Sequence, residues 1–298
     1  MIYLFLSIIT STFFGICFKL LERWRINSFQ TIVFNYFMAA SLGFVTTASD
    51  IGITEIPFQR WSLLGAFLGF IFIGSLYVIA LTTQTMGITV AQVANKMSLI
   101  IPVTAAVLLY GDTITIWKIA GIILAVIAVF CVSNKESEIS SSGKINRKLF
   151  TLPVIIFLCS GAIDLCINYA QVYYLTKDDF EVFLSSIFGT AGIIGSIWMM
   201  YNIIYRDDRI DKKSIPAGLV LGAINFCTMF FIIKALNAGI LEASVLYPIN
   251  NMCVLALSSL IAYFIFREKL SRINWLGIVL SILSILLIAF SYLFVFFS

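Results

Sequence analysis

The sequence has no histidine and very little charge, and both deficits narrow what the chain can be. Only 11% of its 298 residues are Asp, Glu, Lys or Arg, whereas about a quarter of a soluble globular protein is charged. So little charge cannot solvate a globule of this size, which excludes a disordered protein, a nucleic-acid binder and most soluble enzymes. The lack of histidine excludes imidazole metal sites and histidine-based catalysis.

Other chemical signals are missing as well. The chain has no CxxC spacing and no GxxxxGK[ST] nucleotide loop, so we expect no metal, no cofactor and no enzymatic activity. Six cysteines fall inside apolar runs, where we interpret them as small packing residues; they are Cys17, Cys131, Cys159, Cys166, Cys227 and Cys253.

Apolar sequence is what the chain has in abundance. Residues of the AVILMFWYC set make up 61% of it, and its mean hydropathy is +1.03. A membrane-spanning helix needs about 20 mostly apolar residues. Ten stretches qualify: 1–19, 28–47, 61–82, 88–110, 116–133, 149–173, 180–205, 214–236, 240–265 and 272–297. They are too long for strands and do not alternate, which favours helices over a barrel. Residues 1–18 lack a basic start and a small-residue cleavage site, so we expect a retained first span.

Glycines and acids recur in the same order in the two halves of the chain. Gly65, Gly69, Gly87, Asp112 and Gly121 are matched by Gly218, Gly222, Gly239, Glu268 and Gly277, at offsets of 152 to 156 residues. We interpret this as duplication of a five-span unit, with residues 1–133 and 149–298 as the copies. The Ser- and charge-rich residues 134–148 form the linker between them. Because five is odd, the second copy must enter the membrane from the opposite side, as an inverted repeat.

Loop charges give the orientation. One face collects 14 of the 19 Lys and Arg: Lys19, Arg23, Arg25, Lys135, Lys144, Arg147, Lys148, Arg206, Arg209, Lys212, Lys213, Arg267, Lys269 and Arg272. By the positive-inside rule this face, with the 134–148 linker, is cytoplasmic. Both chain ends are then predicted to lie on the external side of the cytoplasmic membrane.

One motif, present in both halves, resembles a known family. The segments 110–115 (YGDTIT) and 266–271 (FREKLS) each lead to a glycine nine residues after the acid. They resemble the acidic GE-x-LS signature of EamA-type transporters, of the drug/metabolite transporter superfamily. In each half a proline, Pro102 or Pro248, lies in the preceding helix. The first copy departs from the pattern with Asp112 for Glu and Thr115 for Ser. The resemblance implies ten helices in two inverted repeats around a central cavity, and transport of small metabolites. It also implies cytoplasmic termini, opposite to the charge pattern.

Two charged residues, Lys96 and Asp164, lie deep within predicted spans, where charge is costly and marks function or pairing. Lys96 lies in 88–110 beside Gln92 and Asn95, and Asp164 lies in 149–173 with Asn168 one turn on. Helix rise places the two charges about 9 Å apart in depth, a gap that a lysine side chain can partly close. Lys96 would bind an anionic group or exchange a proton, with Asp164 as its counter-charge. The alternative is a structural ion pair or a lysine reaching for the interface.

The second copy carries a matching polar patch. Under the 152-residue offset, Tyr247, Asn250 and Asn251 in the 240–265 stretch lie opposite the Lys96 region. Polar patches at equivalent depths in both repeats are typical of a carrier with a central site. Hydrogen bonding between helices explains these amides equally well.

Taken together, the sequence predicts an all-α membrane protein with ten transmembrane helices in two inverted five-helix repeats. We expect a secondary transporter that moves a small organic solute by alternating access, with a proton or another ion as candidate coupling partner. Its other partner is the lipid bilayer, and nucleic acid is excluded. The alternative is a membrane scaffold or sensor of the same fold that transports nothing. The sequence does not specify an oligomeric state.

Overall fold

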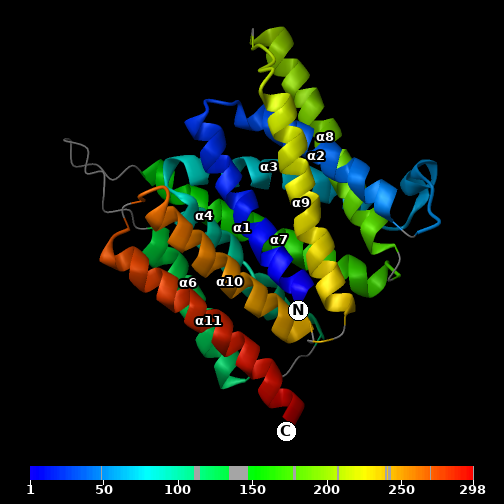
Figure 1. Cartoon of the computed structure of the whole chain (residues 1–298). Helices are drawn as coiled ribbons and strands as arrows, with labels where there is room; N and C mark the ends of the chain where they lie inside the picture. Colours follow the sequence, from blue (N-terminus) through cyan, green and yellow to red (C-terminus); the bar gives the residue numbers. More distant parts are fainter. Residues whose placement is uncertain are drawn as a thin grey trace.

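The computed structural model is a bundle of helices, and the residues that it describes contain no β-strand (Figure 1). It describes residues 1–47, 49–110, 115–133, 147–176, 179–206, 208–238, 240, 243–268 and 270–297. Side chains are described in these ranges apart from 106–110, 133, 147–150, 237, 243–245 and 291–297. The helices are α1 (Ile2–Arg23), α2 (Ser28–Thr46), the 3₁₀ helix η1 (Ile53–Phe58), α3 (Ser62–Thr85), α4 (Ile88–Met97), α5 (Ile100–Tyr110), α6 (Ile116–Ser133), α7 (Arg147–Tyr173), α8 (Phe180–Tyr205), α9 (Ser214–Asn237), α10 (Ala243–Phe264) and α11 (Arg272–Phe297).

Nine candidate spans in the described part of the chain are long and apolar enough to cross a membrane, if α4 and the start of α5 are taken as one. α6 is equally apolar but shorter. Large apolar side chains stay exposed on the outer helices, as at Ile123 and Phe130 of α6 and at Val279 and Phe290 of α11. Lipid can cover such side chains, whereas water disfavours them. The helices therefore indicate a multi-pass membrane protein.

The predicted span 88–110 is interrupted near its middle, although its first 18 residues still form one candidate span. The structure ends α4 at Met97 and begins α5 at Ile100. Pro102 has no amide hydrogen, and its ring collides with the carbonyl four residues earlier, which belongs to Ser98. The hydroxyl of Ser98 turns back and donates to the Asn95 carbonyl oxygen at 2.6 Å. The break therefore follows from the proline and lies two residues after Lys96.

Helices from the two parts of the chain pack against each other throughout the bundle. α2 contacts α8 and α9, and α3 contacts α7 and α8. α1 contacts α9 and α10, α4 contacts α7 and α10, and α6 pairs with α11 along one edge (Figure 1). Both chain ends lie toward the bottom of the view in Figure 1. The core is thus formed between residues 1–133 and residues 147–298, not within either part alone.

Gly69 and Gly222, which occupy matched positions in the glycine pattern of the two halves, both lie close to a neighbouring helix. A Cβ atom on Gly69 of α3 would lie 2.8 Å from Cβ of Thr190 in α8. A Cβ atom on Gly222 of α9 would lie 2.6 Å from Cβ of Met38 in α2 and would also collide with the Asn35 carbonyl oxygen. Both distances are shorter than carbon atoms tolerate, so glycine is required where these helices cross.

This packing predicts opposite effects at two glycines of α3. We expect Gly69→Ala to destabilise the protein by about 1–3 kcal/mol, because the added methyl group overpacks the contact with α8. Gly74→Ala is the matched control, since a Cβ there meets nothing within 4 Å. That change should be neutral or stabilise by up to about 1 kcal/mol, because alanine favours the helix. Unfolding of the purified variants in one detergent tests both. Equal stabilities would show that α3 and α8 do not pack as described.

Candidate functional site

Lys96 lies at the end of α4, immediately before the helix break. Its side chain is half-buried, on a helix that packs against α6, α7 and α10. Among the residues that the structure describes, Lys96 has no carboxylate within 4.0 Å and no side-chain hydrogen bond. An ammonium group in this position can donate to a ligand without first losing a protein partner.

Asp164 lies in the middle of α7 and is within electrostatic range of both Lys96 and Tyr247. Its side chain is exposed, and so is that of Asn168 one turn later. Because its charge acts on residues of α4 and α10, this exposed face points toward those helices rather than toward lipid. The structure shows no direct ion pair between Lys96 and Asp164, which was the structural alternative for these two residues. The two charges instead interact across more than 4.0 Å.

The α10 residues of the predicted patch divide into two environments. Tyr247 is 38% exposed and lies within range of the Asp164 charge. Asn250 is only 6% exposed, and its Oδ1 accepts a hydrogen bond from the Ser7 hydroxyl of α1 at 3.2 Å. Asn251 is half-buried. Asn250 therefore forms a hydrogen bond between α1 and α10, as expected if this amide stabilises helix packing and does not bind a solute. Tyr247, in contrast, lies in the same region as the charges of Asp164 and Lys96.

Gln92 is turned toward α1 instead of toward Lys96. It is 7% exposed, and its amide nitrogen occupies the space in which a side chain on Gly15 would lie. Within the part of the chain that the structure describes, its Oε1 has no hydrogen-bond partner, and the same holds for the buried hydroxyls of Thr12, Thr89 and Ser259. Asn95 is half-buried, and its backbone carbonyl accepts the bond from Ser98.

The sequence analysis did not predict that Thr12, Thr89 and Ser259 belong to the polar region. Each is a polar residue within an apolar stretch, which could have marked it as a site residue. Serine and threonine are common in membrane helices, however, so this pattern alone does not single them out. Unpaired buried oxygens are costly and are concentrated where water or a ligand can reach them. Thr12 lies in α1, Thr89 near the start of α4 and Ser259 in α10, so these hydroxyls come from three helices that contact one another.

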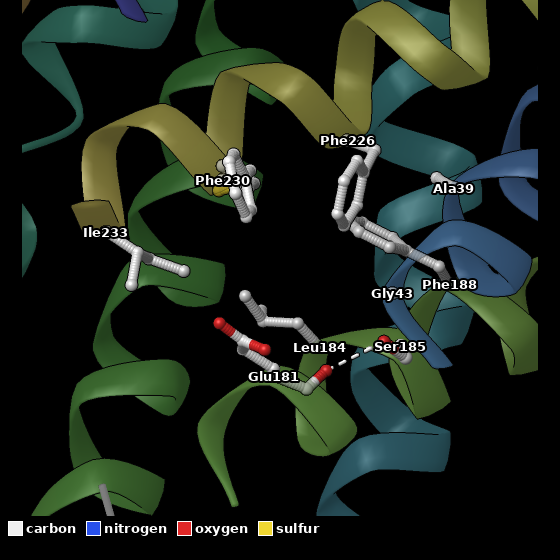
Figure 2. A pocket seen from close by; sticks show the side chains of 10 residues that line it. Ala39, Gly43, Glu181, Leu184, Ser185, Phe188, Phe226, Phe230 and Ile233 are labelled. Carbon is white, nitrogen blue, oxygen red and sulfur yellow. Dashed lines mark hydrogen bonds between the residues drawn. The ribbon is translucent and has the colours of Figure 1, made fainter. Parts of the chain in front are cut away.

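Two clefts lie away from these charges. One is enclosed by α2, α8 and α9, where the Glu181 carboxylate points into a pocket below Phe230 and Ile233 (Figure 2). Its cavity of about 20 Å³ holds about one water molecule. The other, of about 560 Å³, lies between the end of α1 and the start of α9 and includes Trp24 and Lys213. Neither is lined by Lys96 or Asp164, so we base the candidate site on the unpaired charges rather than on cavity size.

The arrangement brings an ammonium, a carboxylate and a phenol from three helices into one region of the membrane interior. The ammonium of Lys96 can bind a carboxylate or phosphate, and Asp164 can accept from an ammonium or hydroxyl group. Tyr247 can do either. Such a set has the donors and acceptors that a small polar solute would require.

Comparison with known proteins supports the fold and leaves the activity open. No family model matches the sequence. An uncharacterized protein of Haemophilus influenzae is 26% identical over 286 residues, which is 95% of each chain. A protein of known crystal structure shares 12% identity and a TM-score of 0.61 over 97% of both chains. The chain therefore shares its whole fold with a solved structure.

Proposed function

We propose that this protein is a secondary carrier of a small organic solute in the cytoplasmic membrane. The convergence of Lys96, Asp164 and Tyr247 carries this proposal. These side chains come from α4, α7 and α10, and the two charges form no direct ion pair. Unpaired charge within a membrane bundle is costly, and it is retained where it contacts a translocated substrate or ion.

The proposal includes ten membrane helices in two inverted five-helix units of the EamA type. Helix packing supports this, because exchanging the units converts each of the most extensive helix contacts into another that is present. The α2–α9 contact becomes α8–α3, and the α1–α9 contact becomes α7–α3. The α2–α8, α4–α10 and α6–α11 contacts map onto themselves.

The glycine contacts follow the same exchange at the level of residues. A side chain on Gly121 of α6 would meet Ile288 of α11, and one on Gly277 of α11 would meet Val132 of α6. Gly277 follows Gly121 by 156 residues, and Ile288 follows Val132 by the same 156 residues. Such matched packing supports the duplication that the glycine spacing predicts.

In alternating access, the two units rock about a site near the middle of the membrane. α4 and α10 contact each other and bring Lys96 and Tyr247 to this interface. Lys96 would bind the anionic group of the solute, and Asp164 would bind its hydroxyl or cationic group or carry a coupling proton. The charge pattern assigns the Lys- and Arg-rich ends of the helices to the cytoplasm.

Transport in reconstituted vesicles tests this function. We expect purified protein to give saturable uptake of at least one small solute with an anionic group, and an imposed proton gradient to change the initial rate if Asp164 carries the coupling proton. Organic acids, amino acids, phosphorylated metabolites and neutral sugars form the panel, and protein-free vesicles are the control. A panel without any saturable, protein-dependent flux would contradict the carrier proposal and favour a scaffold.

A further inference from the structure

A contact between Gly87 and Glu268 joins the two parts of the chain at one end of the bundle. Gly87 immediately precedes α4 and has φ of +106°, a conformation that favours glycine. A Cβ atom there would lie 2.7 Å from Glu268 Oε2. The next residue, Ile88, donates its backbone N–H to Glu268 Oε1 at 2.8 Å. Glu268 follows α10, so this contact spans 180 residues of sequence.

The chemistry makes this a strong contact for an exposed end of a membrane bundle. The first amide groups of a helix have no partners within the helix and carry partial positive charge. A carboxylate that accepts from them forms a charge-assisted hydrogen bond. Gly87 permits it, because any larger residue would occupy the space of the carboxylate. Glu268 thereby attaches the start of the helix that carries Lys96 to the end of the helix that carries Tyr247.

Contacts within the two parts of the chain are uneven. α3 contacts α1 and α2 within its own part of the chain, whereas contacts of comparable extent between α9 and α7 or α8 are absent from the described residues. The pocket of Figure 2 lies between α8 and α9. It is formed by the last turns of α2 and α9 and the first turns of α8, which is the end of the bundle away from Gly87.

We propose that Glu268 is a latch that closes the cytoplasmic end of the transport pathway and is released when that end opens. The proposal rests on the proposed carrier function and names the gate of its site. The latch holds α4 against the end of α10, on the side of Lys96 from which the solute would leave toward the cytoplasm. When this end opens, the backbone amides at the start of α4 must separate from the Glu268 carboxylate. Water can then form hydrogen bonds with both groups in place of the lost contact.

Distance measurements between spin labels test the latch directly. Labels at Thr85, which ends α3, and at Phe264, which ends α10, report the separation at the Gly87 end. Both positions are exposed, and the six native cysteines are replaced first. We expect one short distance in the parent protein in lipid nanodiscs. Glu268→Ala should add a longer population and change the open-to-closed ratio about tenfold or more, as loss of a hydrogen bond to a charged group predicts.

Two further variants make the result specific. Glu268→Gln keeps the acceptor oxygen and loses the charge, so it should give a smaller shift in the same direction. If the Glu268→Ala variant does not fold, the distances in the Glu268→Gln variant test the latch instead. Glu55→Gln removes an exposed acid from η1 and should leave the distances unchanged. Unchanged distances in a folded Glu268 variant would make this carboxylate a static cap and overturn the latch.

The outcome is separable from that of the transport assay, because the distances are measured without solute. If the protein transports solute but substitution of Glu268 leaves the spin-label distances unchanged, the proposed function stands and the latch is contradicted. A protein that shifts its distances and transports nothing would keep the movement and lose the carrier function.

Discussion

Lys96→Met is expected to abolish solute transport while the protein still inserts and folds. Methionine keeps the length and apolar stem of the side chain and removes the ammonium group. Lys96 has no ion-pair partner within 4.0 Å in the described structure, so its charge is available for a ligand. Loss of a buried charge interaction costs about 2–5 kcal/mol, or at least a roughly 30-fold loss of affinity.

The measurement is initial uptake into vesicles that contain equal amounts of folded variant and parent protein. Lys96→Arg should retain part of the activity, because it keeps the positive charge and changes only its shape. Lys212→Met is the matched control, since this lysine is exposed in the segment before α9. Parental uptake by the Lys96→Met vesicles would reduce Lys96 to a structural residue and withdraw the main support for the candidate site.

The helices were the part of the fold most readily predicted from sequence. Apart from 88–110, which divides into α4 and α5, each apolar stretch coincides with an observed helix to within a few residues, because lipid imposes a minimum length on an apolar span. The glycine positions were also predictable, since Gly69 and Gly222 lack side chains at crossings that leave no room for one. The break after Met97 could have been predicted too, from the collision of Pro102 with the carbonyl four residues earlier.

The contacts of individual polar side chains were less predictable. Tyr247 and Asn250 are three residues apart in one helix, yet Tyr247 is near Asp164 and Asn250 is buried against Ser7. Which neighbour each meets depends on the rotation of α10, and a polar patch in the sequence does not specify that rotation. The Gly87–Glu268 contact was beyond prediction for another reason. It joins loops 180 residues apart, and neither loop contains a sign of its partner.

Asp164→Asn is expected to restore part of the stability that Lys96→Met removes. The single lysine variant leaves the Asp164 carboxylate without the positive charge that acts on it. Removing one partner of a direct buried ion pair typically costs about 3–5 kcal/mol. We expect a coupling of only about 1 kcal/mol here, because the Lys96 nitrogen has no Asp164 oxygen within 4.0 Å and the Asp164 side chain is exposed. The double variant should thus be more stable than Lys96→Met alone.

A double-mutant cycle measures this coupling from the unfolding free energies of the parent, both single variants and the double variant in one detergent. A coupling near 1 kcal/mol means that the two charges share one polar region yet leave each other free for ligands, as a binding site requires. A coupling of about 3–5 kcal/mol would identify a closed structural ion pair and contradict the site as described. Strictly additive effects would show that Asp164 and Lys96 do not interact energetically. The candidate site would then include Lys96 but not Asp164.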